Sequence, residues 1–322
     1  MDIIIRPLSP FGAEVIGLDL DKPNALDATV RDALLAAWVQ HGILLFRNTL
    51  HSEEAHLRLS RVFGDPQPSA VSRINDAANP YLMTLNQTPG DASKETFTLF
   101  EIDGQRRTGW LGWHWDQSFT AEIVRGALLR MITPAKFDGR TGFIDAAAAY
   151  DRLAPAMQRR IEGLEVVYHF TAAQEQNRFG FPRGLRVAQR NPKAEAALAQ
   201  YRRDFPPVVH PLVITQHETG RKVLKLSPMH AQAILGMDEA ESDALLHELA
   251  DHLVDARFAY FHTWQADDGI VWDNWRTIHS ATGVPFDVER LAQRTTLVGD
   301  YKLGRYLDPA DGRGGARRRF DD

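Results

Sequence analysis

The chain has 322 residues, of which 44% are hydrophobic, so it can bury a sizeable core in one large domain or two ordinary ones. Its net charge of −5 gives no reason to expect nucleic acid as a partner. The absence of cysteine excludes disulfides, thiolate metal ligands and a cysteine nucleophile, which leaves His, Asp, Glu and solvent as the ligands of any metal.

Nothing in the sequence predicts export or insertion into a membrane. The first ten residues contain no charged segment followed by a long apolar run, as a signal peptide would. Apolar stretches such as residues 42–46 are far too short to cross a bilayer. We therefore expect a cytoplasmic protein without a membrane partner.

The N-terminal region predicts two short strands, at residues 2–6 and 13–18, followed by a helix. Asp27 is a suitable N-cap for that helix. Gly42 ends it before a buried strand at residues 43–46.

A second helix is expected between Ser52 and Gly64. Residues 69–107 then mix strand-like pieces with polar turns. Such a long, poorly patterned segment is typical of an active-site lid or binding loop, or else of a disordered segment. Strand signals return at residues 126–132, and Asp145 is placed to cap a further helix.

The C-terminal half predicts a helix at residues 194–201, strands at 210–215 and 221–226, and a helix that begins with a capping box of Asp238 and Glu241. Further strands are expected at residues 257–264, 270–272 and 294–298. Short strands at both ends with helices between them favour a mainly β fold with inserted helices, such as a β-sandwich or jelly roll.

We expect residues 1–304 to form a single domain and residues 305–322 to form a flexible C-terminal tail. Residues 312–320 of that tail combine arginines with glycines. A solvated, frayed terminus is favoured over an electrostatic tether for such a segment.

Most of the twelve histidines carry no motif. Five are expected on helix surfaces or at helix caps: His41, His51, His56, His247 and His252. Five others are expected to be structural: His169, His210, His217, His230 and His262.

His114 is different, because it lies two residues before Asp116. On a strand, residues two apart point to the same face, so the two side chains would aim at one point while Trp115 points away. The pair is a weak signal by itself, since it occurs by chance in many proteins. A shared metal needs a third ligand, and His279, which follows Trp272-Asp273-Asn274, is the candidate.

Two histidines and one carboxylate on one face of a metal leave the opposite positions open. That arrangement suits iron(II), which must bind a co-substrate and oxygen together. The absence of thiolates argues against a structural zinc site.

Two arginines, Arg290 and Arg294, are spaced by four residues, which places both on one face of a strand. An arginine that points into a barrel is costly unless it is paired. A carboxylate held by a bidentate guanidinium is a natural partner. The alternative is a pair of surface arginines near a turn.

Together these features resemble the family of taurine dioxygenase and 2,4-dichlorophenoxyacetate dioxygenase, and the similarity extends from about Arg6 to Asp300. The segments that carry it are, in chain order, residues 12–20, Phe46-Arg47, Phe63-Gly64, residues 113–116, 139–143, 210–213 and 272–274, His279, Arg290 and residues 294–300. Several independent segments in one order make this resemblance specific.

The resemblance implies a double-stranded β-helix, which is a jelly roll, and a homo-oligomer. It implies that His114, Asp116 and His279 bind Fe(II), and that O2 and 2-oxoglutarate are co-substrates. It also implies that Thr141 and Arg290 hold the distal carboxylate of 2-oxoglutarate.

For the substrate, the resemblance aligns Arg294 with an arginine that contacts the sulfonate or carboxylate of acidic substrates, and it places Asn86 near a substrate-lining stretch. Residues 94–109 are longer and more aromatic than the corresponding loop in taurine dioxygenase, and Trp110 stands where that enzyme has a small polar side chain. These differences argue against taurine. Trp110, Trp113, Trp115 and Phe119 are expected mostly in the core, with a subset as candidate walls of an apolar pocket.

The implied reaction hydroxylates a small anionic substrate and decarboxylates 2-oxoglutarate to succinate and CO2. Asp116 favours hydroxylation over halogenation, because halogenating relatives lack this carboxylate so that chloride can occupy its site. Desaturation and oxidative cleavage would use the same ligands.

Three rival functions stay open. A zinc-dependent hydrolase would leave Thr141 and the paired arginines unexplained. A non-catalytic binding protein would keep the fold, although such proteins usually lose a ligand. Nicotinamide-dependent oxidation is disfavoured, because no Gly-x-Gly-x-x-Gly follows a strand and opens a helix.

Overall fold

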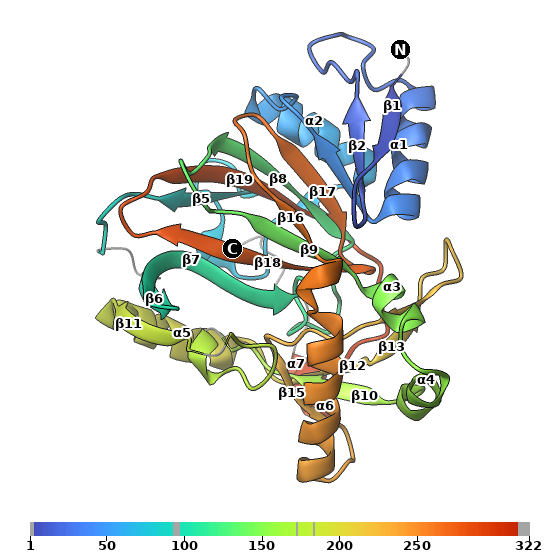
Figure 1. Ribbon diagram of the computed structural model, residues 1–322, viewed down its shortest axis with the longest axis vertical. Helices are drawn as coiled ribbons and strands as arrows, with labels where there is room; N and C mark the ends of the chain where they lie inside the picture. The colour runs from blue at the N-terminus through green and yellow to red at the C-terminus, as the bar shows by residue number, and fades with distance from the viewer. Residues whose placement is uncertain (1–2, 93–96, 172, 183, 315–322) are drawn as a thin grey trace.

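The computed structural model describes residues 3–92, 97–171, 173–182 and 184–314, and two β-sheets lie at its centre (Figure 1). The larger sheet contains, in spatial order, β1 (Ile4–Pro7), β2 (Ala13–Ile16), β3 (Ile43–Phe46), β17 (Gly269–Asp273), β8 (Gly126–Thr133), β19 (Arg290–Leu297) and β4 (Pro66–Gln67), with β5 (Leu82–Gln87) also paired to β19. The second sheet contains β11 (Arg186–Arg190), β6 (Thr98–Ile102), β7 (Gln105–His114), β18 (Thr277–Pro285), β9 (Thr141–Asp145) and β16 (Tyr260–His262).

The space between the two sheets is filled by apolar side chains from both. This inner cluster includes Ile43, Leu129 and Ala292 from the larger sheet and Phe143 from the second sheet. Strand side chains alternate between faces, so each strand that contributes to this cluster also sends every second residue to its other face. Polar residues on the inner faces therefore lie among apolar side chains.

Two helices cover the outer face of the larger sheet, α1 (Ala28–His41) and α2 (Glu53–Phe63) (Figure 1). Asp27 and Ser52 cap them as expected, each accepting a hydrogen bond from a backbone N–H in the first turn. Gly42 ends α1 with a φ of 75°, a conformation that favours glycine. Apolar residues of both helices pack with those of β2 and β3.

A second layer lies beneath the two sheets. It contains a four-stranded sheet of β15 (Ala231–Ile234), β10 (Glu165–Tyr168), β12 (Val208–Pro211) and β20 (Arg305–Tyr306), and a hairpin of β13 (Val213–Thr215) and β14 (Lys222–Leu224). Its helices are α3 (Ala146–Asp151), α4 (Pro155–Ile161), α5 (Pro192–Asp204), α6 (Glu239–Leu253) and α7 (Pro309–Gly314). Short 3₁₀ turns lie at Ser72–Ile74, Gln174–Gln176 and Ala256–Phe258.

The expectation of a mainly β fold with inserted helices is confirmed, and the two facing sheets have the arrangement of a jelly roll. Residues 69–107, which were expected to mix strand-like pieces with polar turns, contain β5, β6 and the start of β7. Residues 93–96 lie outside the described residues.

Three further details differ from the expectations. Residues 210–215 were expected as one strand, but β12 and β13 belong to different sheets and meet at Leu212. β18 was not predicted at all, although it carries His279. In the expected tail, β20 pairs with β12, while residues 315–322 lie outside the described residues.

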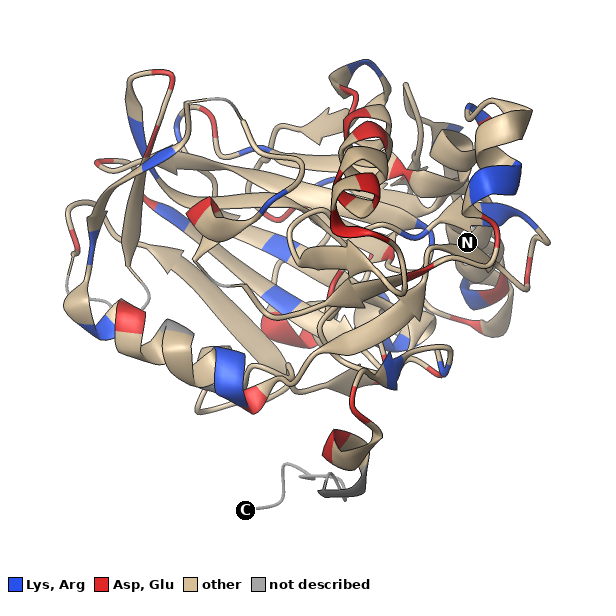
Figure 2. Ribbon diagram, turned by 90° about the horizontal axis from the view of Figure 1, so that it is seen from below, with Lys and Arg blue, Asp and Glu red and all other residues tan. Residues whose placement is uncertain are grey.

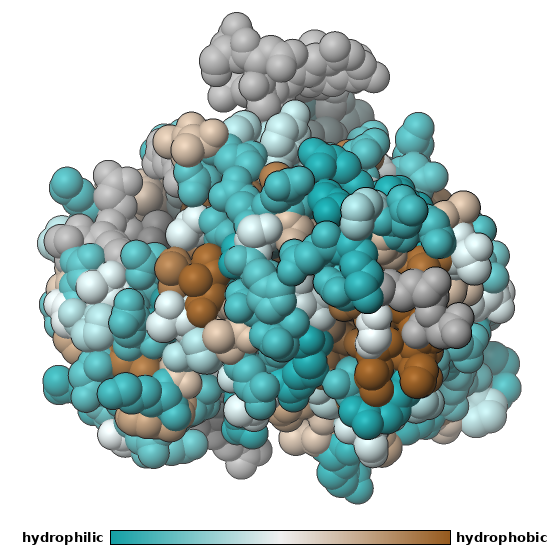
Figure 3. Space-filling model, turned by 90° about the horizontal axis from the view of Figure 1, so that it is seen from above, coloured by the Kyte–Doolittle hydropathy of each residue, from teal (hydrophilic) through white to brown (hydrophobic). Residues whose placement is uncertain are grey.

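The exterior is mixed in charge and mostly hydrophilic. Acidic and basic residues are distributed over the whole ribbon in Figure 2. Figure 3 shows hydrophilic residues over most of one face, with apolar residues gathered in two small areas. Within the described part of the chain, no helix is both long and apolar enough to cross a membrane.

Arg276 ties three elements together in the interior. Its guanidinium donates to the Asp145 carboxylate at 3.0 and 2.6 Å and to the carbonyl oxygens of Val39 and Gln40 at 2.9 Å each. Asp145 in turn caps α3 through a hydrogen bond from the Ala147 N–H. One side chain therefore joins the end of α1, the start of α3 and the segment before β18.

We expect Arg276→Met to lower the free energy of unfolding by about 3–5 kcal/mol, because it leaves a buried carboxylate without its main partner. Urea denaturation measures this difference. Arg6→Met is the control, because Arg6 forms an exposed ion pair with Glu14, and such pairs are worth about 0–1 kcal/mol. Equal losses in the two variants would contradict the role assigned to Arg276.

Candidate metal and co-substrate site

Two neighbouring strands bring His114 and His279 together. His114 is the last residue of β7, His279 lies in β18, and the two are paired across the strands. Their ring centroids are 4.2 Å apart. Asp116 Oδ1 lies 3.8 Å from His114 Nε2 and 3.7 Å from His279 Nε2.

These separations fit a shared metal ion. One ligand atom from each of His114, Asp116 and His279 lies within 4.8 Å of the others, and all three residues are buried. Ligands that sit about 2.1 Å from one ion lie roughly 3–4 Å from one another. The three donors are therefore placed to bind one ion without a large movement of the backbone.

Asp116 lies beyond the end of β7, so it has no partner in the strand ladder. The side chain of Asn274 supplies the backbone hydrogen bonds that a neighbouring strand would otherwise make with Asp116. Its Oδ1 accepts from the Asp116 N–H at 2.7 Å, and its Nδ2 donates to the Asp116 carbonyl oxygen at 3.0 Å. Trp115 points away into the core, where its ring packs against Tyr168, as the sequence predicts.

The second oxygen of the Asp116 carboxylate is held by two donors. Trp272 Nε1 donates to Oδ2 at 3.1 Å, and Arg294 Nη2 lies 2.5 Å from the same atom. Burial alone would raise the pKa of Asp116, but Arg294 and the two histidines together lower it. The carboxylate is therefore ionised, with Oδ1 directed toward the histidines.

The two histidines are held in the form that binds metals. Burial lowers the pKa of His114 and takes that of His279 well below its usual value. His114 Nδ1 lies 2.7 Å from the Gly112 carbonyl oxygen, so Nδ1 carries the proton and donates it. His114 Nε2 is left with a lone pair that faces Asp116.

Arg290 is the second charged feature of the site. It is largely buried, and its side chain makes no ion pair or hydrogen bond with any residue that the structure describes. Burial lowers the pKa of Arg290 to about 10, so the guanidinium is still charged at neutral pH. A buried cation without a protein partner is costly, which indicates a site for an anionic ligand.

Arg290 and Arg294 lie on the inner face of β19 together with Ala292, which packs between the sheets. Thr141 is buried at the start of β9, and its Oγ1 accepts a hydrogen bond from Trp264 Nε1 at 3.0 Å. Because that bond uses an acceptor position of the hydroxyl, the Thr141 proton is free to be donated elsewhere.

Asn86 is the predicted site residue that the structure does not bring to the triad. It is exposed on β5 opposite Leu291, and Thr88 donates to its Oδ1 at 3.2 Å. Its neighbour Gln87 is paired with Arg290 and accepts from Thr108 at 2.9 Å. Since neighbouring residues of a strand point to opposite faces, Gln87, and not Asn86, shares the inner face.

Sequence reasoning missed several residues that shape the site. Trp272, Asn274 and Trp264 were given no role, although the first two stand in the Trp-Asp-Asn segment that was used for the resemblance. The pairing of Arg294 with Asp116 was also missed. A possible signal was the run of hydrogen-bonding side chains just before a candidate ligand, but the sequence does not show which partner each one takes.

The aromatic residues near His114 lie in different surroundings. Trp110 lies four residues before His114 on β7, beyond a register shift in the pairing with β18, and its ring packs against Phe100 and Phe181 at 5.7 Å each. Trp115 and Phe119 are buried in the core. Trp110, with its two aromatic neighbours, stays a candidate wall of an apolar pocket.

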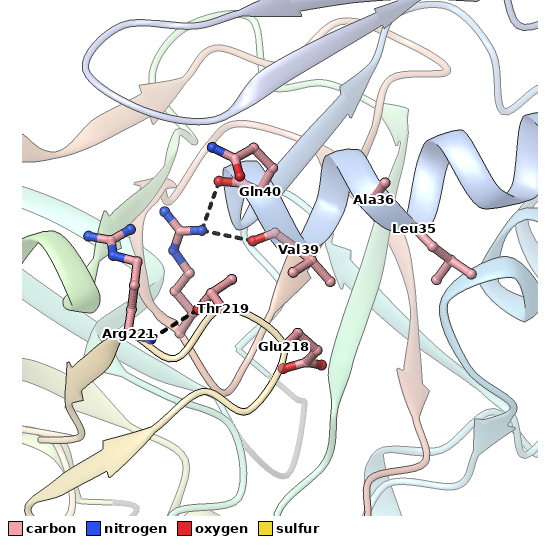
Figure 4. Close-up of a pocket in the computed structure, with 8 residues that line it drawn as sticks. Leu35, Ala36, Val39, Gln40, Glu218, Thr219 and Arg221 are labelled. Atoms are coloured by element: carbon pink, nitrogen blue, oxygen red, sulfur yellow. Dashed lines mark hydrogen bonds between the residues drawn. The ribbon is translucent and has the colours of Figure 1, made fainter.

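A surface pocket between α1 and the β13–β14 turn contains none of the predicted site residues (Figure 4). It is lined by Leu35, Ala36, Val39, Gln40, Glu218, Thr219, Arg221 and Arg276. Its charged groups are already paired, with Arg221 2.6 Å from Asp151 and Glu218 2.9 Å from Arg125. The pocket offers no free catalytic group among the described residues.

Four histidines outside the triad are buried: His56, His210, His230 and His262. The expectation that His56 lies on a surface or at a cap was wrong, because its ring lies against the sheet with Nε2 3.1 Å from the Leu128 carbonyl oxygen. Burial lowers the pKa of His56, His210 and His230 to about 3. These three are therefore neutral in the folded protein near neutral pH.

Their burial predicts how stability depends on pH. The pKa of an unfolded histidine is about 6.5, so between pH 3 and 6.5 the unfolded chain binds more protons than the folded one. Stability is therefore lost as the pH falls through this window. We expect each buried histidine to cost about 1.4 kcal/mol per pH unit below 6.5.

Urea denaturation at pH 7.5 and 5.5 measures this loss, and His56→Gln should remove about one histidine's share of it. His51→Gln is the control, because His51 is exposed. An unchanged pH dependence in His56→Gln would show that His56 does not resist protonation in the folded state.

Comparison with known proteins gives a consistent result. The model of the "Taurine catabolism dioxygenase TauD, TfdA family" matches residues 4–296. The chain is 29% identical over 301 residues to an (S)-phenoxypropionate/alpha-ketoglutarate-dioxygenase of Sphingobium herbicidovorans, covering 92% of this chain and 95% of the relative. It is 30% identical over 292 residues to the Delftia acidovorans protein of the same name, covering 90% and 92%.

Solved structures agree with the sequence comparison. The crystal structure of AAD-2 in complex with Mn(II) and N-oxalylglycine matches with a TM-score of 0.69 and 25% identity. The match covers 94% of this chain and 100% of that one. The expected jelly-roll fold is therefore confirmed over nearly the whole chain.

Proposed function

The chain belongs to the TauD/TfdA family of alpha-ketoglutarate-dependent dioxygenases, and we propose that it uses iron(II) to hydroxylate a small anionic substrate. The observation that carries this proposal is the buried cluster of His114, Asp116 and His279. It is accompanied on an inner strand by Arg290, which has no ion-pair or hydrogen-bond partner among the described residues. A zinc-dependent hydrolase would have no use for that arginine.

In this proposal the three clustered residues hold the iron. His114 and His279 offer neutral imidazole nitrogens, and Asp116 offers Oδ1 as an anionic donor. When bound, iron(II) with 2-oxoglutarate and O2 supplies oxidative decarboxylation to succinate and CO2 coupled to oxidation of the substrate. Trp272, Arg294 and Asn274 keep Asp116 in one orientation and exclude water from its second oxygen.

Arg290 and Thr141 would bind the distal carboxylate of 2-oxoglutarate. A guanidinium with no protein partner among the described residues matches a carboxylate in charge and in geometry. The Thr141 hydroxyl, held by Trp264, would donate a second hydrogen bond. Together they would fix the end of the co-substrate that lies farthest from the iron.

The substrate is proposed to carry an anionic group and an apolar body. Arg294 supports the anion: it is largely buried, and its Nε has no partner among the described residues although Nη2 is paired with Asp116. Trp110, with Phe100 and Phe181, supports the apolar part. Phenoxypropionate, which names two relatives of this chain, combines both features.

Hydroxylation is favoured because Asp116 occupies the third ligand position, although desaturation and oxidative cleavage would use the same residues. The homo-oligomeric state and the cytoplasmic location expected from the sequence stay predictions. The metal site itself can be tested without knowing the substrate.

An anaerobic titration of metal-free protein with iron(II) and then 2-oxoglutarate, followed by visible absorption, tests the proposal. A weak charge-transfer band that requires both additions is expected, because a keto acid chelated to iron(II) absorbs in the visible range. His279→Ala should abolish the band, and His217→Ala, at an exposed histidine, should keep it. A folded wild-type protein without the band would contradict the proposed site.

If the band forms, succinate release identifies substrates from a panel of carboxylates, sulfonates and sulfate esters with aromatic or alkyl bodies. Arg294→Ala should weaken the apparent affinity for the best anionic substrate. An unchanged KM for that substrate would remove the argument for an anionic group.

A further inference from the structure

A lysine is buried in the core beside the metal site. Lys225 follows β14 and is 1% exposed, in a segment otherwise made of apolar residues. Its Nζ lies 4.2 Å from the ring centroid of Trp115, the residue between His114 and Asp116. Lysine is almost never fully buried unless its charge is paired, so its presence needs a reason.

The Lys225 ammonium group makes one hydrogen bond with the described residues. Its Nζ donates to the carbonyl oxygen of Asn274 at 2.5 Å, and no carboxylate of the described residues lies within ion-pair distance. Its own backbone is fixed, because its N–H donates to the Leu212 carbonyl oxygen at 2.8 Å and its carbonyl oxygen accepts from the Tyr168 hydroxyl at 3.0 Å. The Lys225 side chain is therefore fixed at its backbone and at its Nζ atom.

Asn274 is fully buried, and all of its polar groups have partners. Its N–H donates to the Arg125 carbonyl oxygen at 3.0 Å, and its Nδ2 donates to Val124 at 3.0 Å as well as to Asp116. Its carbonyl oxygen is the group that Lys225 satisfies. Without Lys225, this buried oxygen would have no donor among the described residues.

We propose that Lys225 is a positioning residue: it holds the Asn274 backbone so that the Asn274 side chain fixes Asp116 as a metal ligand. This inference rests on the proposed function of His114, Asp116 and His279 as the iron site. The physical reason is that Asp116 lies past the end of β7, where no strand partner holds its backbone. Asn274 supplies both missing hydrogen bonds, and Lys225 keeps Asn274 in position.

The hydrogen bond, and not the charge alone, carries this role. Burial takes the pKa of Lys225 well below its usual value, while the carboxylates of Asp273 and Asp116 act to raise it. A lysine side chain keeps an N–H donor in either protonation state. An apolar side chain of similar length would fill the same space but leave the Asn274 carbonyl oxygen unsatisfied.

The test compares Lys225→Met with Leu246→Ala. Leu246 is buried on α6 in the same apolar cluster as Trp115, and Leu→Ala there destabilises the core without removing a hydrogen bond. The readout is the Kd for cobalt(II) alone, measured anaerobically from its visible absorption, together with the urea midpoint of each variant. Neither measurement depends on turnover.

We expect Lys225→Met to raise the cobalt(II) Kd by about 10- to 100-fold, the range found when a residue that orients a metal ligand is removed. Leu246→Ala should leave the Kd within about twofold of wild type at a comparable loss of stability, since it touches no group that orients a ligand. Lys225→Gln, which is polar but too short to reach Asn274 unaided, should show the same loss as Lys225→Met. This second variant keeps the test usable if the first does not fold.

A double-mutant cycle separates the proposed route from a general effect. If Lys225 acts through Asn274, Lys225→Met should add little to the Kd already raised by Asn274→Asp. Fully additive effects, or a wild-type Kd in a folded Lys225 variant, would overturn the inference. Failure of wild-type protein to bind cobalt(II) would instead contradict the proposed metal site, so the two failures are distinguishable.

Discussion

Asp116→Asn is expected to abolish metal-dependent succinate formation, with a fall of at least about 10³-fold, the scale seen when a catalytic group is removed. The amide keeps the shape of the carboxylate but loses the negative charge that binds the metal. Asp116 is the single anionic member of the cluster, and its Oδ1 lies close to the Nε2 atoms of both histidines. The cobalt(II) Kd should therefore rise by about 10²-fold or more.

The same substitution leaves Arg294 without its carboxylate partner, so a change in stability has to be measured alongside binding. Circular dichroism and urea denaturation show whether the fold survives. Asp19→Asn is the control, because Asp19 forms an exposed ion pair with Lys22 and is not a member of the metal-binding cluster. Metal binding that persists in a folded Asp116→Asn protein would mean that the cluster is not the iron site.

Arg290→Met is expected to separate function from stability. Loss of the guanidinium should raise the KM for 2-oxoglutarate by about 10²-fold, because removing one partner of a buried charged pair costs about 2–5 kcal/mol. The cobalt(II) Kd should not change, since no ligand residue contacts Arg290 among the described residues. Binding and chemistry at the metal should thus stay intact while the co-substrate is lost.

In the absence of 2-oxoglutarate, the same variant should be more stable than wild type, by about 1–3 kcal/mol. Burial lowers the pKa of Arg290 to about 10, which reflects the cost of keeping a largely buried cation that has no partner among the described residues. Methionine fills similar space without that cost. The buried guanidinium of Arg290 would therefore destabilise the free protein, and the carboxylate of 2-oxoglutarate would offset that cost on binding. Binding sites commonly lower the stability of the free protein in this way.

Urea denaturation with and without saturating 2-oxoglutarate and metal measures both effects. Wild-type protein should be stabilised by the ligand, because the ligand binds only the folded state, and Arg290→Met should respond little. Arg6→Met, at an exposed ion pair, should behave as wild type. A less stable Arg290→Met protein with normal KM would mean that Arg290 has a structural role instead.

Local features of the fold were predictable from the sequence. Asp27, Ser52, Asp145 and Asp238 each cap the helix that was expected to follow them. These predictions held because a cap depends on a few neighbouring residues and on one side-chain oxygen. The mainly β class with inserted helices was predictable for the same reason, since alternation and turn residues are local signals.

The spacing of His114 and Asp116 predicted two ligands of the triad, and the resemblance supported His279 as the third. His114 and Asp116 are close in sequence, but His279 lies 165 positions after His114, in a strand that the pattern did not reveal. β18 contains buried Thr, His and Ser residues where a strand of this kind usually has apolar ones. The polar residues of β18, including the ligand His279, therefore masked the sequence pattern by which a buried strand is normally predicted.

The sequence by itself determined the ligand types, the helix caps and the arginine spacing, because residue identity and short-range geometry are sufficient for these. The tertiary structure decided which face each side chain shares and which partner it takes. It paired Arg294 with Asp116, turned Asn86 outward and buried Lys225 against Asn274. Strand register and long-range packing set these contacts, and a shift of one residue would reverse every face.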